Sequence, residues 1–299
     1  MTAGRAHGGL SRSRTLTALA FLSPNLAGFL VFTLLPLGAA LILAFAEWDT
    51  ANPIVFVGLK NFLRLFKDET FKISLVNTLY YTVATVPLTM ICSLGIALVL
   101  NRKIKARGFF RSAFFFPYVV SMVAVAVVWN MLLHPTMGPV NNFLSFLGVA
   151  KPPGWTASTE WAMPAVILAS VWRQAGFFMV IYLAGLQGIP RSLYEAAEMD
   201  GAGAWARFWK VTFPGLAPVT FFVSVMLVIN GFKIFDLIIV MTDGGPGRAT
   251  NVLVYDIYYT AFMSFRFGYA SAISMVLLII VLAITVLQFQ LEKRMRESA

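Results

Sequence analysis

The stretch Pro190-Arg-Ser-Leu-Tyr-Glu195-Ala-Ala-Glu-Met-Asp200-Gly201 is a polar insert between two long apolar segments, and it decides how the whole chain is interpreted. Ser192 followed three residues later by Glu195 has the spacing of a helix-initiating capping box. Gly201 is well placed to end the same helix, because glycine adopts the left-handed conformation of a C-terminal cap. The pattern therefore predicts a short helix from residue 193 to about residue 200.

Such a short helix is marginal on its own and needs a surface to pack against. Ala196 and Ala197 leave one face almost without side-chain bulk, so another protein could approach the backbone closely there. A helix that lies on a membrane surface usually carries Lys and Arg on its polar face, whereas this one carries Glu195, Glu198 and Asp200. We therefore interpret the insert as a docking helix for a soluble protein.

The composition around the insert is that of a membrane protein. The chain has 299 residues, of which 59% are hydrophobic and 12% charged, and its mean hydropathy is +0.79; soluble domains carry about 25% charged residues. Its one cysteine, Cys92, excludes an intrachain disulfide. The net charge of +10 comes from short basic runs between apolar segments, which argues against nucleic acid as a partner.

A helix needs about 20 apolar residues to cross a bilayer. We expect an all-α bundle of six transmembrane helices, in one domain over residues 15–292, with spans at about 15–46, 73–101, 112–133, 162–183, 211–232 and 267–291. The first span is too long for the apolar region of a signal peptide. Residues 1–14 are expected to be a disordered tail, and residues 293–299 a short C-terminal tail.

The distribution of Lys and Arg predicts the orientation. The N-terminal tail has three Arg and no acidic residue, and the 101–111 loop has five basic residues and no acidic one. The loops at 47–72, 134–161 and 233–266 each balance to zero. By the positive-inside rule, both termini and the loop at 184–218 are therefore expected to be cytoplasmic.

The insert and the residues after it resemble the EAA motif of membrane subunits from binding-protein-dependent, ATP-driven importers. The matching positions are Glu195-Ala196-Ala197, Gly201 and Val211-Thr-Phe-Pro214, at the spacings of that family. Val and Phe replace the Ile and Leu of the usual pattern. Similarity to the sugar branch (the maltose and glycerol-3-phosphate importers) extends from about Leu19 to Glu292, and includes Phe56-Val-Gly-Leu59, Phe115-Phe-Pro117 and Gly244-Gly-Pro-Gly247.

This resemblance implies the six-helix core of a type I importer, in the cytoplasmic (inner) membrane of a bacterium. The docking helix would be a coupling helix held in a cleft of an ATPase, with Glu195 paired to a basic residue of that ATPase and Gly201 permitting the turn. Ala196, Ala197, Asp200 and Pro214 complete the expected coupling motif. The implied partners are a second, homologous permease subunit, two ATPase subunits and an external substrate-binding protein. ATP and magnesium would bind to the ATPase, and no cofactor to this chain.

Four polar residues in or beside the spans are candidates for the substrate pathway. Arg173 lies near the middle of the fourth span, where a charge usually faces a cavity or a partner; the alternative is an arginine paired to a carbonyl or an acid of another helix. Asn230, Lys233 and Asp236 end the fifth span, and Lys233 and Asp236 are spaced to pair on one helix face. That pair could line the pathway or simply end the helix.

The loop Thr242-Asp-Gly-Gly-Pro-Gly247 is rich in turn-forming residues, and it could contact the external binding protein or be an ordinary connection. No Gly-Lys dipeptide, HExxH or Gly-x-Ser-x-Gly occurs, so neither a phosphate-binding P-loop nor these catalytic motifs are present. The predicted function is thus a transport subunit, not an enzyme, for sugars or oligosaccharides. The alternatives are glycerol-3-phosphate import, an ion-coupled carrier, and a six-span enzyme or assembly factor whose acidic loop recruits a soluble partner.

Overall fold

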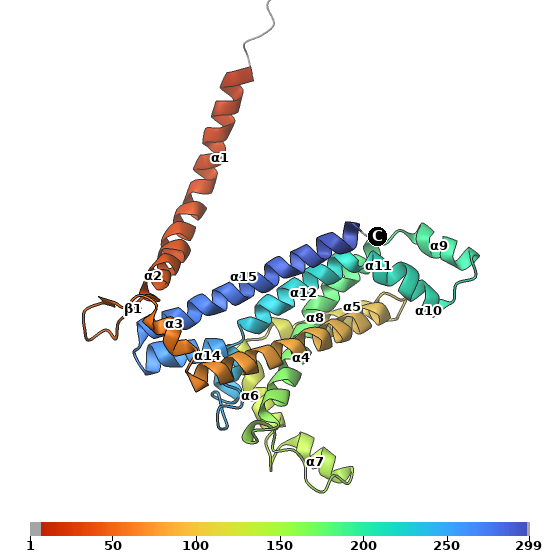
Figure 1. Cartoon of the computed structure of the whole chain (residues 1–299). Helices are drawn as coiled ribbons and strands as arrows, with labels where there is room; N and C mark the ends of the chain where they lie inside the picture. Colours follow the sequence, from red (N-terminus) through yellow and green to blue (C-terminus); the bar gives the residue numbers. More distant parts are fainter. Residues whose placement is uncertain (1–6, 298–299) are drawn as a thin grey trace, which may run out of the picture.

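The computed structural model describes residues 7–297, and nearly all of the long segments in it are helical (Figure 1). The long helices lie where apolar residues run without interruption by charge. Their bounds are α1 (His7–Phe29) and α2 (Leu35–Leu43), joined by the π-helical turn Leu30–Leu34, then α4 (Glu69–Leu100), α8 (Ala162–Gly188), α12 (Ala217–Phe232) and α15 (Phe267–Glu297).

Shorter elements connect these helices. The remaining helices are α3 (Lys60–Leu65), α5 (Arg107–Val119), α6 (Met122–Leu132), α7 (Pro139–Phe146), α9 (Arg191–Met199), α10 (Ala204–Arg207), α11 (Phe213–Gly215), α13 (Asp236–Met241) and α14 (Leu253–Tyr258). Single turns of 3-10 or π-helix lie at Trp155–Ala157, Phe208–Thr212 and Tyr259–Met263. Two short strands, β1 (Ala46–Glu47) and β2 (Val55–Phe56), form an antiparallel hairpin in which Ala46 pairs with Phe56.

Helix α4 packs along α8, and also against α12 and α14, at the centre of the bundle (Figure 1). Its buried face is a stripe of small hydroxyl residues, namely Ser74, Thr78, Thr82, Thr85, Thr89 and Ser93. Small polar residues let membrane helices approach closely, because the apolar tails of lipids supply no hydrophobic force between the helices. The Tyr81 hydroxyl donates to Ser170 Oγ at 2.6 Å, which joins α4 to α8 within the core.

Four helices are long and apolar enough to cross a membrane, and two bent pairs bring the number to six if each pair is one span. The expected helical architecture is therefore confirmed, but two spans differ from their predicted form. The predicted span 112–133 consists of α5 and α6, which meet at 99°. Pro117 removes a backbone donor from the last turn of α5, and Ser121 is extended, so one straight helix is interrupted here.

The predicted span 211–232 is also bent. Residues 204–215 form one helical segment, and α12 begins only at Ala217, at 64° to that segment. Pro218 lies in the first turn of α12, where its missing N–H costs nothing. Helix α12 has 16 residues, so this span is long enough to cross a membrane only together with the segment before it.

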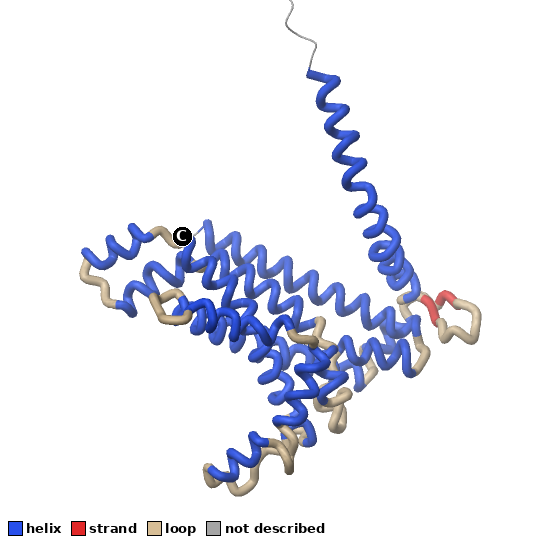
Figure 2. The backbone as a smooth tube through the Cα atoms, turned by 180° about the vertical axis from the view of Figure 1, so that it is seen from behind, coloured by secondary structure: helices blue, strands red, loops and turns tan. Residues whose placement is uncertain are grey.

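The two ends of the chain differ from the tails expected at 1–14 and 293–299. Helix α1 begins at His7, so residues 7–14 are helical, while residues 1–6 lie outside the described part. At the other end α15 continues to Glu297. Helix α1 stands away from the bundle (Figures 1 and 2), and none of its most apolar stretch between Arg14 and Leu43 is buried by the rest of the described chain.

Candidate coupling site and pathway residues

The docking helix predicted from the sequence is α9, which lies at one end of the bundle beside α10 and α11 (Figure 1). Gly201 ends it as expected, with a φ of +75°. The Gly201 N–H donates to the Glu198 carbonyl at 3.0 Å, and the Ala202 N–H donates to the Ala197 carbonyl at 2.9 Å. These two bonds form a Schellman motif, which requires a left-handed residue where the glycine lies.

The predicted capping box is wrong. Helix α9 begins at Arg191, two residues earlier than expected, and Pro190 is its N-cap without a side-chain hydrogen bond. Ser192 therefore lies inside the helix. Glu195 instead pairs with the Nε of Arg191 at 3.0 Å, one helical turn away. Both side chains are well exposed, so this pair contributes little stability, and the Glu195 carboxylate stays available to a partner.

The remaining residues of the predicted motif are displayed at the surface of the described chain. Ala196 and Asp200 are exposed, Ala197 is half-buried, and Pro214 is exposed in α11. Two apolar side chains accompany them on α9, because Leu193 is 50% and Met199 is 84% exposed. A short helix with exposed alanine, leucine, methionine and carboxylate groups is suited to contact with another protein surface.

Two contacts that the sequence interpretation missed hold α9 against the rest of the chain. The hydroxyls of Tyr194 and Thr212 lie 3.0 Å apart, and Thr212 is buried. Arg207 Nη1 lies 3.2 Å from Glu198 Oε2. Both contacts link α9 to the segment before α12. Helical spacing could not reveal these pairs, because a turn at Gly201 separates their members.

Arg173 is paired with a backbone carbonyl of another helix, which is the alternative to a cavity-facing arginine. Its Nη2 donates to the Tyr118 carbonyl at 3.1 Å, and its guanidinium lies 5.0 Å from the centre of the Tyr118 ring. The Tyr118 ring stacks in turn on Phe177, with 4.3 Å between the ring centres. Tyr118 lies just before the break between α5 and α6, where helical hydrogen bonding ends. Arg173 therefore supports the bent span, and within the described chain its buried Nε has no hydrogen-bond partner.

The predicted pair on one helix face, Lys233 with Asp236, is wrong. Helix α12 ends at Phe232, Lys233 caps it, and Asp236 begins the separate helix α13. Residues 7–297 contain no ion pair between the two side chains. Asn230, Lys233 and Asp236 are all exposed around this helix break. These three residues thus lie in one region, around the break between α12 and α13. Arg173 lies apart from them, on α8 where it meets the end of α5.

The glycine-rich loop at 242–247 is irregular, as expected, and lines a pocket of about 320 Å³ with α14. The Tyr255 hydroxyl donates to Asp243 Oδ1 at 3.0 Å and orders the loop. Asp256 is buried in the same pocket and accepts from Ser74 Oγ at 3.3 Å. Burial, together with repulsion from Asp68, raises the pKa of Asp256 to about 6. The sequence interpretation had not singled out Asp256.

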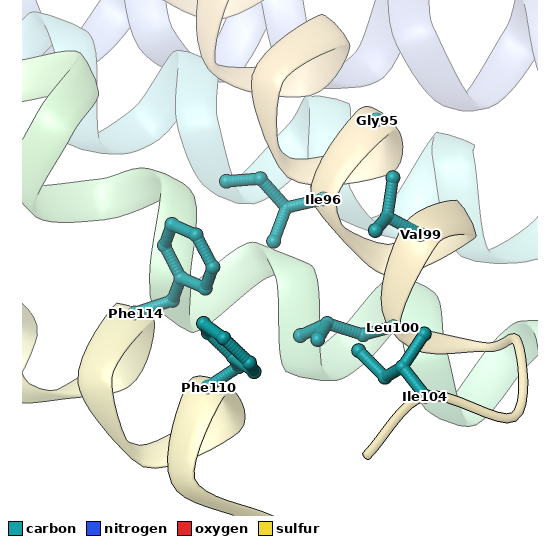
Figure 3. Close-up of a pocket in the computed structure, with 7 residues that line it drawn as sticks. All are labelled: Gly95, Ile96, Val99, Leu100, Ile104, Phe110 and Phe114. Atoms are coloured by element: carbon teal, nitrogen blue, oxygen red, sulfur yellow. The ribbon is translucent and has the colours of Figure 1, made fainter. Parts of the chain in front are cut away.

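An apolar cavity of about 360 Å³ lies between the end of α4 and the start of α5 (Figure 3). Its lining residues, labelled in the figure, are Gly95, Ile96, Val99, Leu100, Ile104, Phe110 and Phe114. A cavity of this kind offers no hydrogen bonds to a sugar or a phosphate, and it fits a hydrocarbon chain. In the described part of the chain no cluster of three or more His, Cys, Asp or Glu residues is arranged to hold a metal ion.

A bundle with four to six candidate membrane spans in the described chain, and with a short exposed helix on one of its loops, defines the class of multi-pass membrane proteins. The model of the family described as "Binding-protein-dependent transport system inner membrane component" matches residues 85–297. The chain belongs to this family of transport permeases, as the EAA resemblance predicted, and it is a transport subunit, not an enzyme.

Named relatives match over most of their length. The probable ABC transporter permease protein YesP of Bacillus subtilis is 39% identical over 93% of this chain and 91% of its own. The probable starch degradation products transport system permease protein AmyD of Thermoanaerobacterium thermosulfurigenes is 31% identical over 92% of this chain and 93% of its own. The sn-glycerol-3-phosphate transport system permease protein UgpA of Agrobacterium fabrum is 38% identical over 80% of this chain and 82% of its own.

Solved structures confirm the type of fold. A chain of a bacterial ABC transporter that imports the acidic polysaccharide alginate superimposes with a TM-score of 0.83, at 26% identity, over 94% of this chain and 96% of that chain. A second structure of a bacterial alginate ABC transporter, in complex with an alginate pentasaccharide-bound periplasmic protein, gives a TM-score of 0.84 at 25% identity, over 97% and 98% of the two chains.

Proposed function

We propose that this chain is one permease subunit of an ATP-driven importer for sugars or oligosaccharides. The observation that carries the proposal is α9, a short exposed helix ended by Gly201 and fastened to the segment before α12 by Tyr194 and Arg207. The family match supports a transport role, and the printed names of AmyD and of the alginate importers point to saccharides.

In the proposed complex, α9 lies on the cytoplasmic side of a bacterial inner membrane and docks into a separate ATPase subunit that binds ATP and magnesium. The excess of Lys and Arg at 101–111 supports this orientation. Glu195, Ala196, Ala197, Asp200, Gly201 and Pro214 would form the coupling surface. A second permease subunit would complete the pathway, and an external binding protein would deliver the substrate.

The proposed mechanism is alternating access. Closure of the two ATPase subunits on ATP would displace α9, and the Tyr194–Thr212 and Glu198–Arg207 contacts would pass that displacement to α12. Asn230 and Lys233 lie at the far end of α12, and Asp236 begins the next helix. Asn230, Lys233 and Asp236 are exposed around the break between α12 and α13, and Arg173 carries a charge inside α8. These four are the proposed pathway residues.

The experiment is uptake by vesicles that contain the complete complex, with ATP supplied inside. We expect uptake of the cognate sugar to stop when ATP is depleted and to continue when an uncoupler collapses the ion gradients. Uptake that survives ATP depletion but fails with the uncoupler would identify an ion-coupled carrier. The composition of the gently solubilised complex gives an independent check, since an assembly factor would be recovered without two ATPase chains.

Import of glycerol-3-phosphate is a second candidate, because UgpA is 38% identical to this chain. Competition separates the candidates. Unlabelled glycerol-3-phosphate would block uptake in a phosphate importer, whereas a neutral oligosaccharide would block it in a sugar importer.

A further inference from the structure

A pocket of about 320 Å³ with both basic and apolar lining residues lies behind the coupling helix, at the end of the bundle that carries α9. Four parts of the chain line it: the end of α4 and the residues after it, the end of α8, helix α9 and the segment before α12. They contribute Leu98, Asn101 and Arg102, then Leu186, then Tyr194, and then Ala204, Arg207, Phe208 and Thr212. No acidic side chain is among its lining residues in the described chain. The pocket is therefore positively charged and opens where α9 meets the membrane helices.

Arg102 has no ion pair within the described chain, and neighbouring residues of the sequence do not neutralise its charge. The loop that follows Arg102 adds Lys103, Lys105 and Arg107 without an acidic residue. Arg207 does have a partner, because its Nη1 lies 3.2 Å from Glu198 Oε2 on α9. The Glu198 side chain is 70% exposed whereas that of Arg207 is 31% exposed, so Arg207 points inward and its partner lies at the rim. An anion that enters the pocket would compete with Glu198 for Arg207.

Apolar groups flank the same pocket, which indicates an amphipathic ligand. The rings of Trp205, Trp209 and Phe213 contact Phe208, which lines the pocket. They are exposed by 75%, 47% and 45%, as is typical of side chains at the boundary between lipid and water. Around the same end of α4 lies the apolar cavity between α4 and α5, where Leu100 and Ile96 point toward Phe110 and Phe114 (Figure 3). A charged head beside Arg102 and a hydrocarbon chain along this cavity would both be accommodated.

We propose that this pocket binds the phosphate of an anionic phospholipid from the inner leaflet, and that the bound lipid regulates the coupling helix. Arg102 and Arg207 are the phosphate ligands, since a guanidinium donates two parallel hydrogen bonds to a phosphate. Basic pockets between membrane helices on the cytoplasmic side are suited to such headgroups. When the phosphate binds Arg207, the Glu198–Arg207 pair opens, and α9 loses one of its two fastenings. The lipid effect on coupling rests on the proposed function, but lipid binding itself does not.

The test measures lipid retention by the intact importer complex with native mass spectrometry, after reconstitution in phosphatidylcholine nanodiscs with and without phosphatidylglycerol. We expect the wild type to retain phosphatidylglycerol selectively. Arg102→Gln is expected to weaken retention at least about tenfold more than the matched variant Lys103→Gln, which removes the same charge next to the pocket without lining it. Arg102→Lys should recover part of the loss.

A second variant acts in the opposite direction. Glu198→Gln removes the competitor for Arg207, so it is expected to strengthen phosphatidylglycerol retention, an effect that a merely structural role for Glu198 would not produce. Equal losses in Arg102→Gln and Lys103→Gln would overturn the pocket in favour of diffuse surface attraction. Reproduction of the lipid effect by inorganic phosphate in phosphatidylcholine nanodiscs would overturn the lipid as its source.

Coupling is measured separately, as the stimulation of ATP hydrolysis by the binding protein in the same nanodiscs. Stimulation that is absent in both lipid mixtures would contradict the proposed function but leave the retention result standing. Stimulation that is present and identical in both mixtures would overturn the regulatory part of this proposal alone.

Discussion

At the scale of single residues, Gly201 is the position where backbone conformation limits the side chain most clearly. Its φ of +75° is left-handed, and an added Cβ would meet no atom within 4 Å, so any penalty comes from backbone strain alone. Left-handed backbone costs an ordinary L-residue roughly 1–2 kcal/mol, and asparagine less. The Schellman bonds at the end of α9 depend on that conformation.

Gly201→Val is therefore expected to weaken the association of the complex with its ATPase by roughly 5- to 30-fold, as measured by a titration of solubilised permease with ATPase. Gly201→Asn is the matched control, and we expect a much smaller loss. If both variants bound like the wild type, the end of α9 would have no part in docking.

Asp256 is a buried carboxyl group that changes its charge near pH 6. Burial and then the repulsion from Asp68 raise its pKa from 3.8 to about 6. A carboxyl group whose pKa is raised by folding stabilises the folded state while it is protonated, and this contribution is lost as the pH rises through about 6. The group is 5% exposed, so solvent screens it little.

The thermal unfolding midpoint of the complex is expected to fall as the pH rises from about 4 to about 7, with a contribution of up to roughly 3 kcal/mol from Asp256. Asp256→Asn should remove this dependence and raise the midpoint above pH 6. Unfolding scans on either side of pH 6 measure it. A wild type and a variant with parallel pH profiles would show that Asp256 does not titrate in this range.

At the scale of elements, the close contact between α5 and α8 explains how a broken span is kept in place. A Cβ at Gly176 would lie 1.8 Å from the Phe114 carbonyl oxygen, so this position accepts only glycine. The contact lies one turn from Arg173, which donates to the Tyr118 carbonyl. The close backbone packing at Gly176 and the hydrogen bond from Arg173 thus both hold α5 against α8.

Gly176→Ala is expected to separate α5 from α8 and to lower the unfolding midpoint of the complex, since overpacking typically costs 1–3 kcal/mol or more. Gly188 lies in the same helix with nothing within 4 Å of its added Cβ. Gly188→Ala should therefore be neutral or slightly stabilising. Equal midpoints in the two variants would contradict the close approach at Gly176.

The same elements show what sequence reasoning could reach. Apolar length predicted where the helices lie, and Gly201 predicted where α9 ends. The break at Val119–Ser121 could not be recognised in this way, because Pro117 is tolerated inside many membrane helices. The start of α9 was misplaced because Ser192 and Glu195 matched a local pattern, whereas the Arg191–Glu195 pair and Pro190 determine the N-terminal turn.

At the scale of the whole molecule, the hydroxyl residues at every third or fourth position along α4 indicate which face of this helix is buried. Contacts between distant segments, such as Tyr194 with Thr212 and Arg173 with Tyr118, were inaccessible because one sequence does not reveal which turns face each other. The proposed role of α9 in docking to an ATPase comes from the resemblance to the family motif, because residue spacing alone predicts a helix and not its partner.

The orientation of the molecule can be tested directly, because Cys92 is its one cysteine. In a Cys92→Ser background, Ser192→Cys in α9 and Ser145→Cys in α7 place single thiols at exposed positions in opposite loops. A membrane-impermeant maleimide is expected to label Ser145→Cys in intact cells and Ser192→Cys only after the membrane is opened. The reverse pattern would place α9 outside and remove the proposed coupling role.

Helix α1 carries a consequence for how the stability of this protein is defined. It is long, strongly apolar and left uncovered by the rest of its own chain, so its surroundings must be supplied by lipid or by a neighbouring polypeptide. Whatever fills those surroundings contributes directly to the free energy that keeps the helix in position. The folding free energy is consequently a shared property of the assembly and its membrane. A mutation in a neighbouring polypeptide that packs on α1 would therefore destabilise a helix that belongs to this chain.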